Sequence, residues 1–249
     1  MSAVNIEVLI EKWFNKKISL ERIEKYCQQL RIEKRRLSEN VNPENIRVSC
    51  VQRQIHPVNN IERYIDMLCG FVDQAAKSNS YLIVFPEYNF FDLFGLIPGF
   101  GFLNQILNKK AIKNKDEEKD REKESDLKGN NNFLTTIFEG VAKPIEAGIK
   151  RIFSLLAKEY GIYIYTGSYI LKEEEGIYNA GSLFGPEGNL IGTQKKIHLT
   201  DFEAKIGLKR ASKMEVYSLP FGKVVCPICM DATYFETFRI AREIGADMV

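Results

Sequence analysis

The sequence predicts a layered α/β domain, and three observations support this prediction. Residues 46–52 alternate in polarity as a strand does, and residues 81–87 form a continuous apolar run typical of a strand covered on both faces. Between them, apolar residues recur at helical spacing on one face: Ile61, Ile65, Leu68, Val72 and Ala76. Strand, helix and strand in this order indicate an α/β fold built in layers.

Composition and charge restrict the class of protein. The chain has 249 residues, of which 45% are hydrophobic and 27% charged, as in ordinary globular proteins. Its 35 basic and 33 acidic residues give a formal net charge of +2, which offers no argument for binding nucleic acid or an anionic membrane. We therefore expect one domain of catalytic size with short extensions, and neither of those partners.

Three further features indicate the cellular compartment. No apolar run approaches the roughly 20 residues that cross a bilayer. The residues that follow Met1 lack the basic and apolar regions of a signal peptide. The five cysteines cannot all pair with one another, so we expect them to be reduced. Together these features predict a cytoplasmic protein.

Residues 1–45 are predicted to form a helical N-terminal extension. Ser19 is a suitable N-cap for a helix whose apolar face consists of Leu20, Ile23, Cys27 and Leu30. A face of this kind predicts packing, either on the same domain or on a second subunit.

Residues 46–249 are assigned to the main domain, with a charged insertion at 109–132. Of the twenty residues at 109–128, fifteen are charged, which predicts a solvated insertion or a mobile loop. Beyond it we expect a helix ending near Tyr160, strands at 162–170, 177–184 and 224–229, a tight turn at 185–188, and a helix at 234–244.

Three residues with suitable chemistry occur at predicted strand ends. Glu87 follows Pro86 at the end of one strand, Lys196 follows a strand-turn-strand unit, and Cys229 lies between a strand and a helix. The N-terminus of that helix is expected to lower the pKa of the thiol and favour the thiolate. A thiol nucleophile, a carboxylate base and a fixed cation would together form a catalytic site.

The segments around these residues resemble three signatures of the nitrilase superfamily of carbon–nitrogen hydrolases, in the order of that family. They are Phe85-Pro-Glu87, Gly188-Asn-Leu-Ile-Gly-Thr-Gln-Lys-Lys196-Ile-His-Leu, and Ile228-Cys229-Met-Asp231 leading into Phe238-Arg239 and Gly245-Ala-Asp. The resemblance implies a four-layer α-β-β-α sandwich with a Glu–Lys–Cys triad. It also implies further strands after the Gly-Ala-Asp segment, so we expect a C-terminally truncated member of the family.

The resemblance assigns a role to each residue of the predicted site. Glu87 would deprotonate Cys229, which would attack an amide, carbamoyl or nitrile carbon and form a thioester, while Lys196 would stabilise the tetrahedral intermediate. Glu203 matches a second glutamate found in many members. The supporting residues would be His198 and Asp231, through hydrogen bonds, and Met230, through its backbone N–H as an oxyanion donor.

The same resemblance implies neither a metal nor an organic cofactor. It implies a small-molecule amide, carbamoyl or nitrile substrate and a homo-oligomeric assembly.

Two other functions are compatible with the sequence. Cys226 and Cys229 form a C-x-x-C pair like that of thioredoxin-like oxidoreductases, although the chain after Cys229 is short for that fold. A nitrilase-like fold could alternatively act as a non-catalytic binding or scaffold protein. A zinc site is disfavoured, because one C-x-x-C supplies two ligands and the two histidines, His56 and His198, are distant in sequence.

Overall fold

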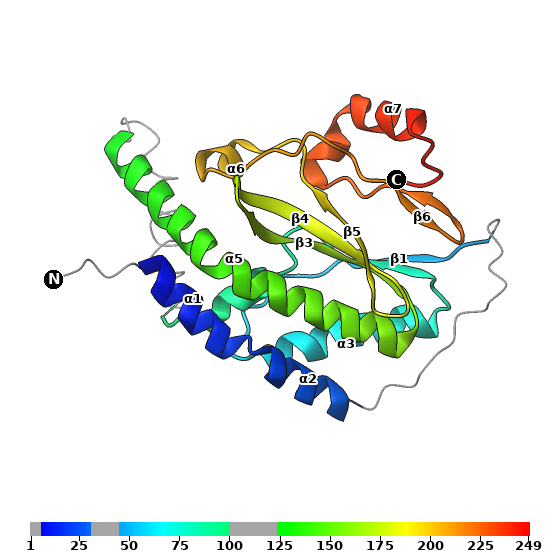
Figure 1. Cartoon of the computed structure of the whole chain (residues 1–249), viewed down its shortest axis with the longest axis horizontal. Coiled ribbons are helices and arrows are strands. Elements are labelled where there is room, and N and C mark those ends of the chain that lie inside the picture. The colour runs from blue at the N-terminus through cyan, green and yellow to red at the C-terminus, as the bar shows by residue number, and fades with distance from the viewer. Residues whose placement is uncertain (1–5, 31–44, 100–123) are drawn as a thin grey trace.

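The computed structural model describes residues 6–30, 45–99 and 124–249, with side chains from residue 134 onward in the last range. Its centre is a five-stranded sheet in the order β1-β2-β3-β4-β5. The first three strands are parallel, and β3, β4 and β5 are successively antiparallel. The strands are β1 (Val48–Cys50), β2 (Leu82–Val84), β3 (Tyr163–Glu173), β4 (Gly176–Phe184) and β5 (Leu190–Lys195) (Figure 1).

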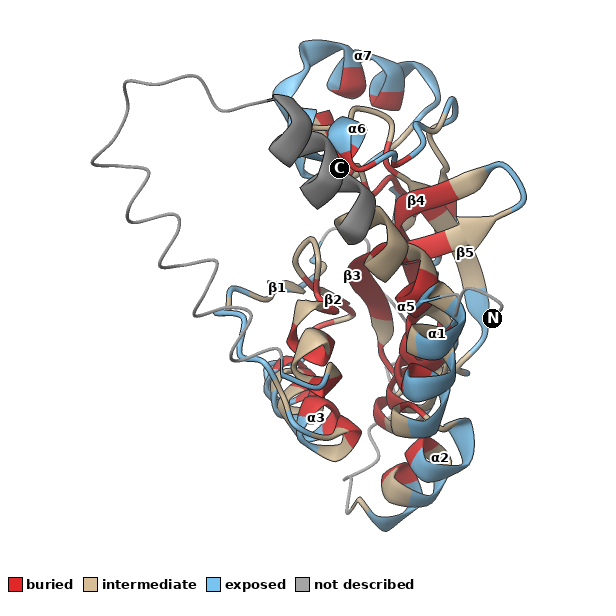
Figure 2. Cartoon of the chain, turned by 90° about the vertical axis from the view of Figure 1, so that its left-hand side faces the viewer, coloured by how far each residue is buried: buried red, intermediate tan, exposed pale blue. Residues whose placement is uncertain are grey.

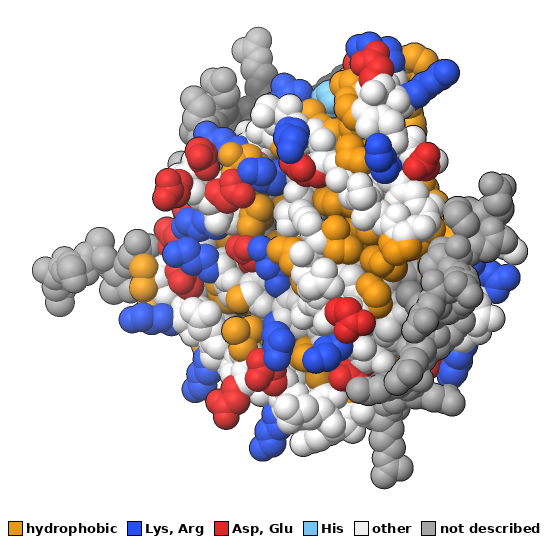
Figure 3. Space-filling model, turned by 45° about the vertical axis from the view of Figure 1, so that its right-hand side comes forward, with side chains coloured by type: hydrophobic (Ala, Val, Ile, Leu, Met, Phe, Trp, Pro, Cys, Tyr) orange, Lys and Arg blue, Asp and Glu red, His pale blue; other side chains and the backbone are white. Residues whose placement is uncertain are grey.

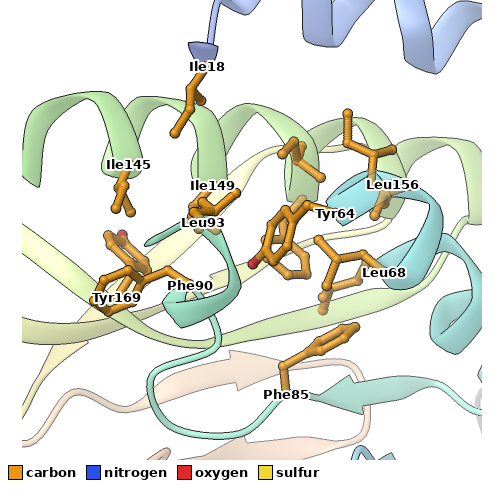
Figure 4. Close-up of a cluster of buried hydrophobic side chains, with 14 of the residues drawn as sticks. Ile18, Tyr64, Leu68, Phe85, Phe90, Leu93, Ile145, Ile149, Leu156 and Tyr169 are labelled. Atoms are coloured by element: carbon orange, nitrogen blue, oxygen red, sulfur yellow. The ribbon is translucent and has the colours of Figure 1, made fainter. Parts of the chain in front are cut away.

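One face of this sheet is covered by the helices α3 (Ile61–Lys77) and α5 (Glu124–Tyr160). Their buried sides and the sheet enclose the larger hydrophobic cluster of the protein (Figure 4). The predicted apolar stripe of α3 is confirmed, because Ile61, Ile65, Leu68 and Val72 are fully buried. Asn60 caps this helix by accepting a hydrogen bond from the Arg63 amide.

The opposite face of the sheet carries a second, smaller sheet and then a helix. The hairpin β6 (Tyr217–Leu219) and β7 (Gly222–Val224) packs on the main sheet, and α7 (Phe235–Glu243) lies on that side (Figure 1). A parallel bridge between Val224 and Met248 extends the small sheet. Helices, sheet, sheet and helix succeed one another, which confirms the predicted four-layer architecture.

The N-terminal helices α1 (Ile6–Lys17) and α2 (Leu20–Gln29) pack on α5 within the same chain (Figure 1). The cap of α2 is confirmed, since the Ser19 side chain accepts a hydrogen bond from the Arg22 amide. Gly148 of α5 allows the close approach, because a Cβ there would lie 2.3 Å from Cγ2 of Ile18. Of the two packing partners considered for the α2 face, its own domain is the one observed, with Ile23 and Cys27 buried (Figure 2).

Two predicted elements differ from the structure. The strand expected at 224–229 includes only the end of β7, at Val224, because Pro227 has no N–H to donate to a ladder. The insertion predicted at 109–132 is partly helical, because α5 begins at Glu124 and extending a packed helix costs less than starting one. The rest of that insertion lies outside the described residues.

Two short helices follow strands of the main sheet. A 3₁₀ helix, η1 (Phe91–Leu96), follows the segment after β2, and α6 (Asp201–Lys205) follows β5. None of the described helices combines the length and the apolar character that crossing a bilayer requires.

Candidate active site

Glu87 follows β2 and is held at the edge of the sheet by the neighbouring strand β3. The register of β3 shifts between Tyr165 and Ser168, and Gly167 takes a φ of +67° there. A Cβ on this glycine would lie 2.1 Å from the carbonyl oxygen of Pro86, so only glycine allows the two backbones to approach this closely. The Ser168 hydroxyl then accepts a hydrogen bond from the Tyr88 amide at 2.9 Å, which fixes the residue after Glu87.

Lys196 lies immediately after β5, and its side chain is completely buried. Its Nζ is 2.7 Å from Oε1 of Glu87 and 2.9 Å from Oε2 of Glu203. Burial lowers the pKa of Lys196, but its hydrogen bonds to the two carboxylates outweigh this effect and the pKa is raised. The site therefore contains a permanent cation between two carboxylates.

Glu203 is positioned by the capping box of the short helix α6. Its amide donates to the Thr200 hydroxyl, and its Oε2 accepts from the Thr200 amide at 2.8 Å. Its Oε1 also accepts hydrogen bonds from Lys196, Tyr88 and Asn179. Burial raises the pKa of Glu203, but these donors reverse the effect and lower it to about 2. Glu203 is thus charged and its oxygens are occupied by donors.

Two residues in this network were not identified from the sequence, Asn179 and Tyr88. Asn179 is fully buried in β4 and donates from Nδ2 to Oε1 of Glu87 at 2.9 Å and to Oε1 of Glu203 at 2.8 Å. Tyr88 donates its hydroxyl to Glu203, and its φ of +54° is unusual for a tyrosine. The available signal was an asparagine inside an otherwise apolar strand, where a polar side chain needs partners.

Cys229 begins the 3₁₀ helix η2 (Cys229–Thr233) and is an exposed residue with a φ of +44°. A non-glycine residue in this region carries strain of about 1–3 kcal/mol, a cost that clusters at functional sites. Partial burial and the hydrogen-bonding carboxylate of Glu87 raise its pKa, and Lys196 lowers it less. The expected lowering of the thiol pKa is therefore wrong, because partial burial and the carboxylate of Glu87 raise it and α7 begins only at Phe235.

Asp231 connects the segment after Lys196 to the segment before Cys229. Its buried carboxylate accepts hydrogen bonds from the amides of His198 at 2.6 Å and Ile228 at 3.0 Å. The ring of His198 contacts Asp231 through Nδ1 at 3.0 Å and stacks on Tyr234. The remaining predicted residue, Met230, follows Cys229 in η2.

Cys226, the other cysteine of the C-x-x-C pair, lies in a hydrophobic cluster and not in the candidate site. Cys226 is buried in the cluster between the two sheets, where burial raises its pKa to about 12. Both Cys226 and Cys229 are free thiols. Among the described residues, no group of three or more histidines, cysteines or acidic side chains is arranged to hold a metal ion.

The assembled site brings together Glu87, Lys196 and Glu203 by direct contacts, with Cys229 beside Glu87. This set contains a thiol, an adjacent carboxylate and a buried cation, which are the kinds of group that covalent acyl transfer uses.

Comparison with known proteins identifies the family. The sequence model described as "Carbon-nitrogen hydrolase" matches residues 47–249. The chain belongs to the carbon–nitrogen hydrolase family. This membership overturns the thioredoxin-like alternative, because the C-x-x-C pair occurs here within a different fold.

Members of the carbon–nitrogen hydrolase family resemble the chain at moderate identity. The omega-amidase NIT2 of Danio rerio is 32% identical over 130 residues, which are 48% of this chain and 46% of that protein. The probable hydrolase YhcX of Bacillus subtilis is 26% identical over 205 residues, 82% of this chain and 33% of that protein. The chain thus spans less than half the length of these relatives.

Solved structures show the same fold at low identity. An amidase from Nesterenkonia sp. covers 81% of this chain, and 62% of its own length is matched, with a TM-score of 0.54 and 18% identity. A carbon–nitrogen hydrolase from Helicobacter pylori G27 also covers 81% of the chain, and 57% of its own length is matched, with a TM-score of 0.53 and 20% identity. This likeness supports the nitrilase-type sandwich.

Proposed function

We propose that this chain hydrolyses a small-molecule amide through a Glu87–Lys196–Cys229 triad and a thioester intermediate. The observation that carries the proposal is the contact of one buried ammonium with two carboxylates, the more exposed of which adjoins the Cys229 thiol. Amides are favoured over carbamoyl compounds and nitriles because the similar proteins include several named omega-amidases and an amidase.

The first half of the reaction uses Glu87 as base and then as acid. Its Oε1 is occupied by Lys196 and Asn179, which leaves the second oxygen for the thiol proton. As this proton moves to Glu87, the sulfur of Cys229 bonds to the carbonyl carbon and the carbonyl π pair moves to oxygen. Glu87 then gives the proton to the departing nitrogen, ammonia leaves, and a thioester remains.

Water completes the cycle. Glu87 takes a proton from water, the oxygen attacks the thioester carbon, and the carbon–sulfur bond breaks to release the acid. The proton held by Glu87 restores the Cys229 thiol. The raised pKa of Cys229 suits this sequence, since the resting nucleophile is a thiol that needs a base at the moment of attack.

Lys196 stabilises the negative charge that develops on the carbonyl oxygen. Its ammonium has three N–H donors, and two of them are used by Glu87 and Glu203. The third is available for the oxyanion, and the amide of Met230 is proposed as a second donor. Glu203 keeps the ammonium in place, while Asp231 and His198 hold the flanking segments together.

Ammonia release from a panel of compounds tests this function. The panel contains simple primary amides, monoamides of dicarboxylic acids, an N-carbamoyl amino acid and a nitrile. Cys229→Ala and Glu87→Gln are expected to abolish release, and the matched control Cys226→Ala retains it because that thiol lies in the inter-sheet core. Activity that survives in Cys229→Ala would contradict the mechanism, and a folded protein inactive on every compound would favour a non-catalytic role.

We also propose a homo-oligomer that uses α7. Apolar side chains on this helix are exposed, and Figure 3 shows hydrophobic atoms at the surface in this region of the molecule. The exposed fractions are 81% for Phe235, 43% for Phe238 and 38% for Ile240, and Ile244 just after the helix is 38% exposed. Light scattering on Phe235→Ser/Phe238→Ser should show a smaller particle than the wild type, and an unchanged mass would contradict the proposal. A cytoplasmic location stays a prediction.

A further inference from the structure

We propose that Asn179 is a positioning residue whose single amide group holds Glu87 and Glu203 beside Lys196, which keeps Glu87 next to the thiol of Cys229. This inference rests on the proposed function, in which Glu87 is the base. Asn179 touches neither the thiol nor the position of the substrate carbonyl in that mechanism, so its contribution acts through the two carboxylates.

The geometry connects all three charged groups to this one residue. The two N–H bonds of its amide point to different carboxylates, at 2.9 Å from Glu87 and 2.8 Å from Glu203. Its backbone carbonyl accepts the Lys196 amide at 2.8 Å, which continues the β4–β5 pairing beyond β5. Since Asn179 is fully buried, water does not replace it in this role.

The orientation of the amide is fixed by charge. Its Oδ1 is buried and has no hydrogen-bond partner among the described residues. Turning the amide over would place this oxygen against two carboxylates, which repel it. The side chain therefore keeps a conformation that leaves one polar atom unsatisfied, a cost that only the contacts of Nδ2 offset.

Electrostatics explains why the two carboxylates need these donors. Two carboxylates that share one ammonium disfavour each other's charge, so one of them tends to bind a proton. Among the described residues, the titratable groups that face Glu87 are Lys196, Glu203, Tyr88 and Cys229, and Lys196 is the positive one. The donors of Asn179 are neutral groups that favour both charged forms at once.

Loss of Asn179 would affect the two carboxylates unequally. Glu203 would keep the hydroxyl of Tyr88, both donors of Thr200 and the ammonium of Lys196. Glu87 would keep Lys196 as its one remaining donor among the described nitrogens. Glu87 is therefore the group whose position would change, and a displaced Glu87 is poorly placed to accept the proton of the thiol.

The pH dependence of Cys229 alkylation by iodoacetamide tests this inference without knowledge of the substrate. The rate is measured for Cys229 alone, by peptide mass spectrometry, from pH 5 to 9. Iodoacetamide reacts with the thiolate, so the wild-type rate rises with pH along a limb set by the pKa of Cys229. Glu87 raises that pKa, so Glu87→Gln should move the limb to lower pH. In Asn179→Ala, where Glu87 loses a donor that holds it beside the thiol, the limb should move the same way by up to about 1 pH unit, which makes alkylation up to roughly tenfold faster on the limb.

Two further variants separate positioning from simple loss of structure. Ser182→Ala removes a different buried polar group from β4, one that bonds Tyr169 and Thr193, and should leave the limb in place. If Asn179→Ala does not fold, Asn179→Ser, which keeps one donor, should show a smaller displacement.

The outcomes distinguish this inference from the proposed function. A limb that stays at the wild-type pH in Glu87→Gln would overturn the contact of Glu87 with the thiol and both proposals with it. A limb that moves in Glu87→Gln but stays at the wild-type pH in the folded Asn179 variants would overturn this inference alone. A shift of equal size in Ser182→Ala would also overturn it, because a general effect on β4 would then suffice.

Discussion

The two faces of the main sheet are stabilised in different ways. The face under α3 and α5 is closed by large apolar side chains such as Tyr64 and Phe153, none of which reaches the solvent (Figure 4). The opposite face has a smaller cluster under β6 and β7, and the outer side of α7 exposes Phe235. The polar site lies at the strand ends and is held by hydrogen bonds to buried charges rather than by apolar packing.

This difference indicates that the helix-covered face and the site have different structural roles. The helix-covered face provides the rigid support, since its apolar contacts are dense and non-directional. The site depends instead on directional contacts whose strength comes from low dielectric and full pairing. Mutations should therefore act mostly on stability at the first face, and on both stability and chemistry at the site.

The largest effect is expected when the buried cation is removed. Lys196→Ala leaves Glu87 and Glu203 without their counter-ion, which should lower the free energy of unfolding by about 3–5 kcal/mol. The neighbouring Lys195→Ala removes a half-exposed pair with Glu173 and should cost less than ~1 kcal/mol. Urea unfolding measures both. Equal losses in the two variants would show that charge pairing does not hold the site.

The next prediction compares the two apolar clusters directly. Phe153→Ala opens a cavity in the closed cluster and should cost about 3–5 kcal/mol. Phe221→Ala lies in the cluster beneath the two-stranded sheet and should cost about 1–2 kcal/mol, because a short surface hairpin collapses more easily onto a cavity. Midpoints of denaturant unfolding show which variant loses more stability. A larger loss of stability for Phe221→Ala than for Phe153→Ala would contradict the prediction.

A pH-dependent contribution is expected from Glu203. Its pKa is about 2 in the folded protein and about 4.5 when unperturbed, so its stabilisation is complete above pH 4.5 and is lost as the pH falls towards 2. The loss should be on the order of 3 kcal/mol across this window. Thermal unfolding at several pH values measures it. Glu203→Gln should flatten the dependence, whereas the exposed Glu174→Gln should leave it as in the wild type.

The smallest effects are expected from two glycines in helices. Gly148→Ala would place a Cβ 2.3 Å from Ile18 and should destabilise by about 1 kcal/mol, since the overlap outweighs the better helix propensity of alanine. Gly70→Ala in α3 has open space around it and should stabilise by about 0.5–1 kcal/mol. Melting temperatures should move in opposite directions, and a rise for Gly148→Ala would mean that α1 and α2 pack loosely.

Much of the fold follows from local patterns in the sequence. Local patterns predict α3 and the long strands β3 and β4, because one face or both faces of each element are buried. The strand ends that carry Glu87 and Lys196 could be located in the same way. The contact of these residues could not, since it depends on the register of strands far apart in sequence.

The features that the sequence analysis missed or predicted wrongly depend mostly on tertiary contacts. The direction of the Cys229 pKa shift depends on burial of the thiol and on the carboxylate of Glu87, which no local pattern reveals. Asn179 looks like an ordinary polar interruption of an apolar strand until both of its acceptors are known. The short β6 lacks a periodic signal, because its three residues are too few to show one.

The raised pKa of Cys229 has a consequence for chemical durability. Peroxide and other oxidants attack thiolates much faster than thiols. Partial burial of the Cys229 thiol and the neighbouring carboxylate of Glu87 both favour its protonated form, so its resistance to oxidation comes from the two effects together. In the mechanism proposed above, the same glutamate would protect the thiol at rest and accept its proton when a substrate occupies the site.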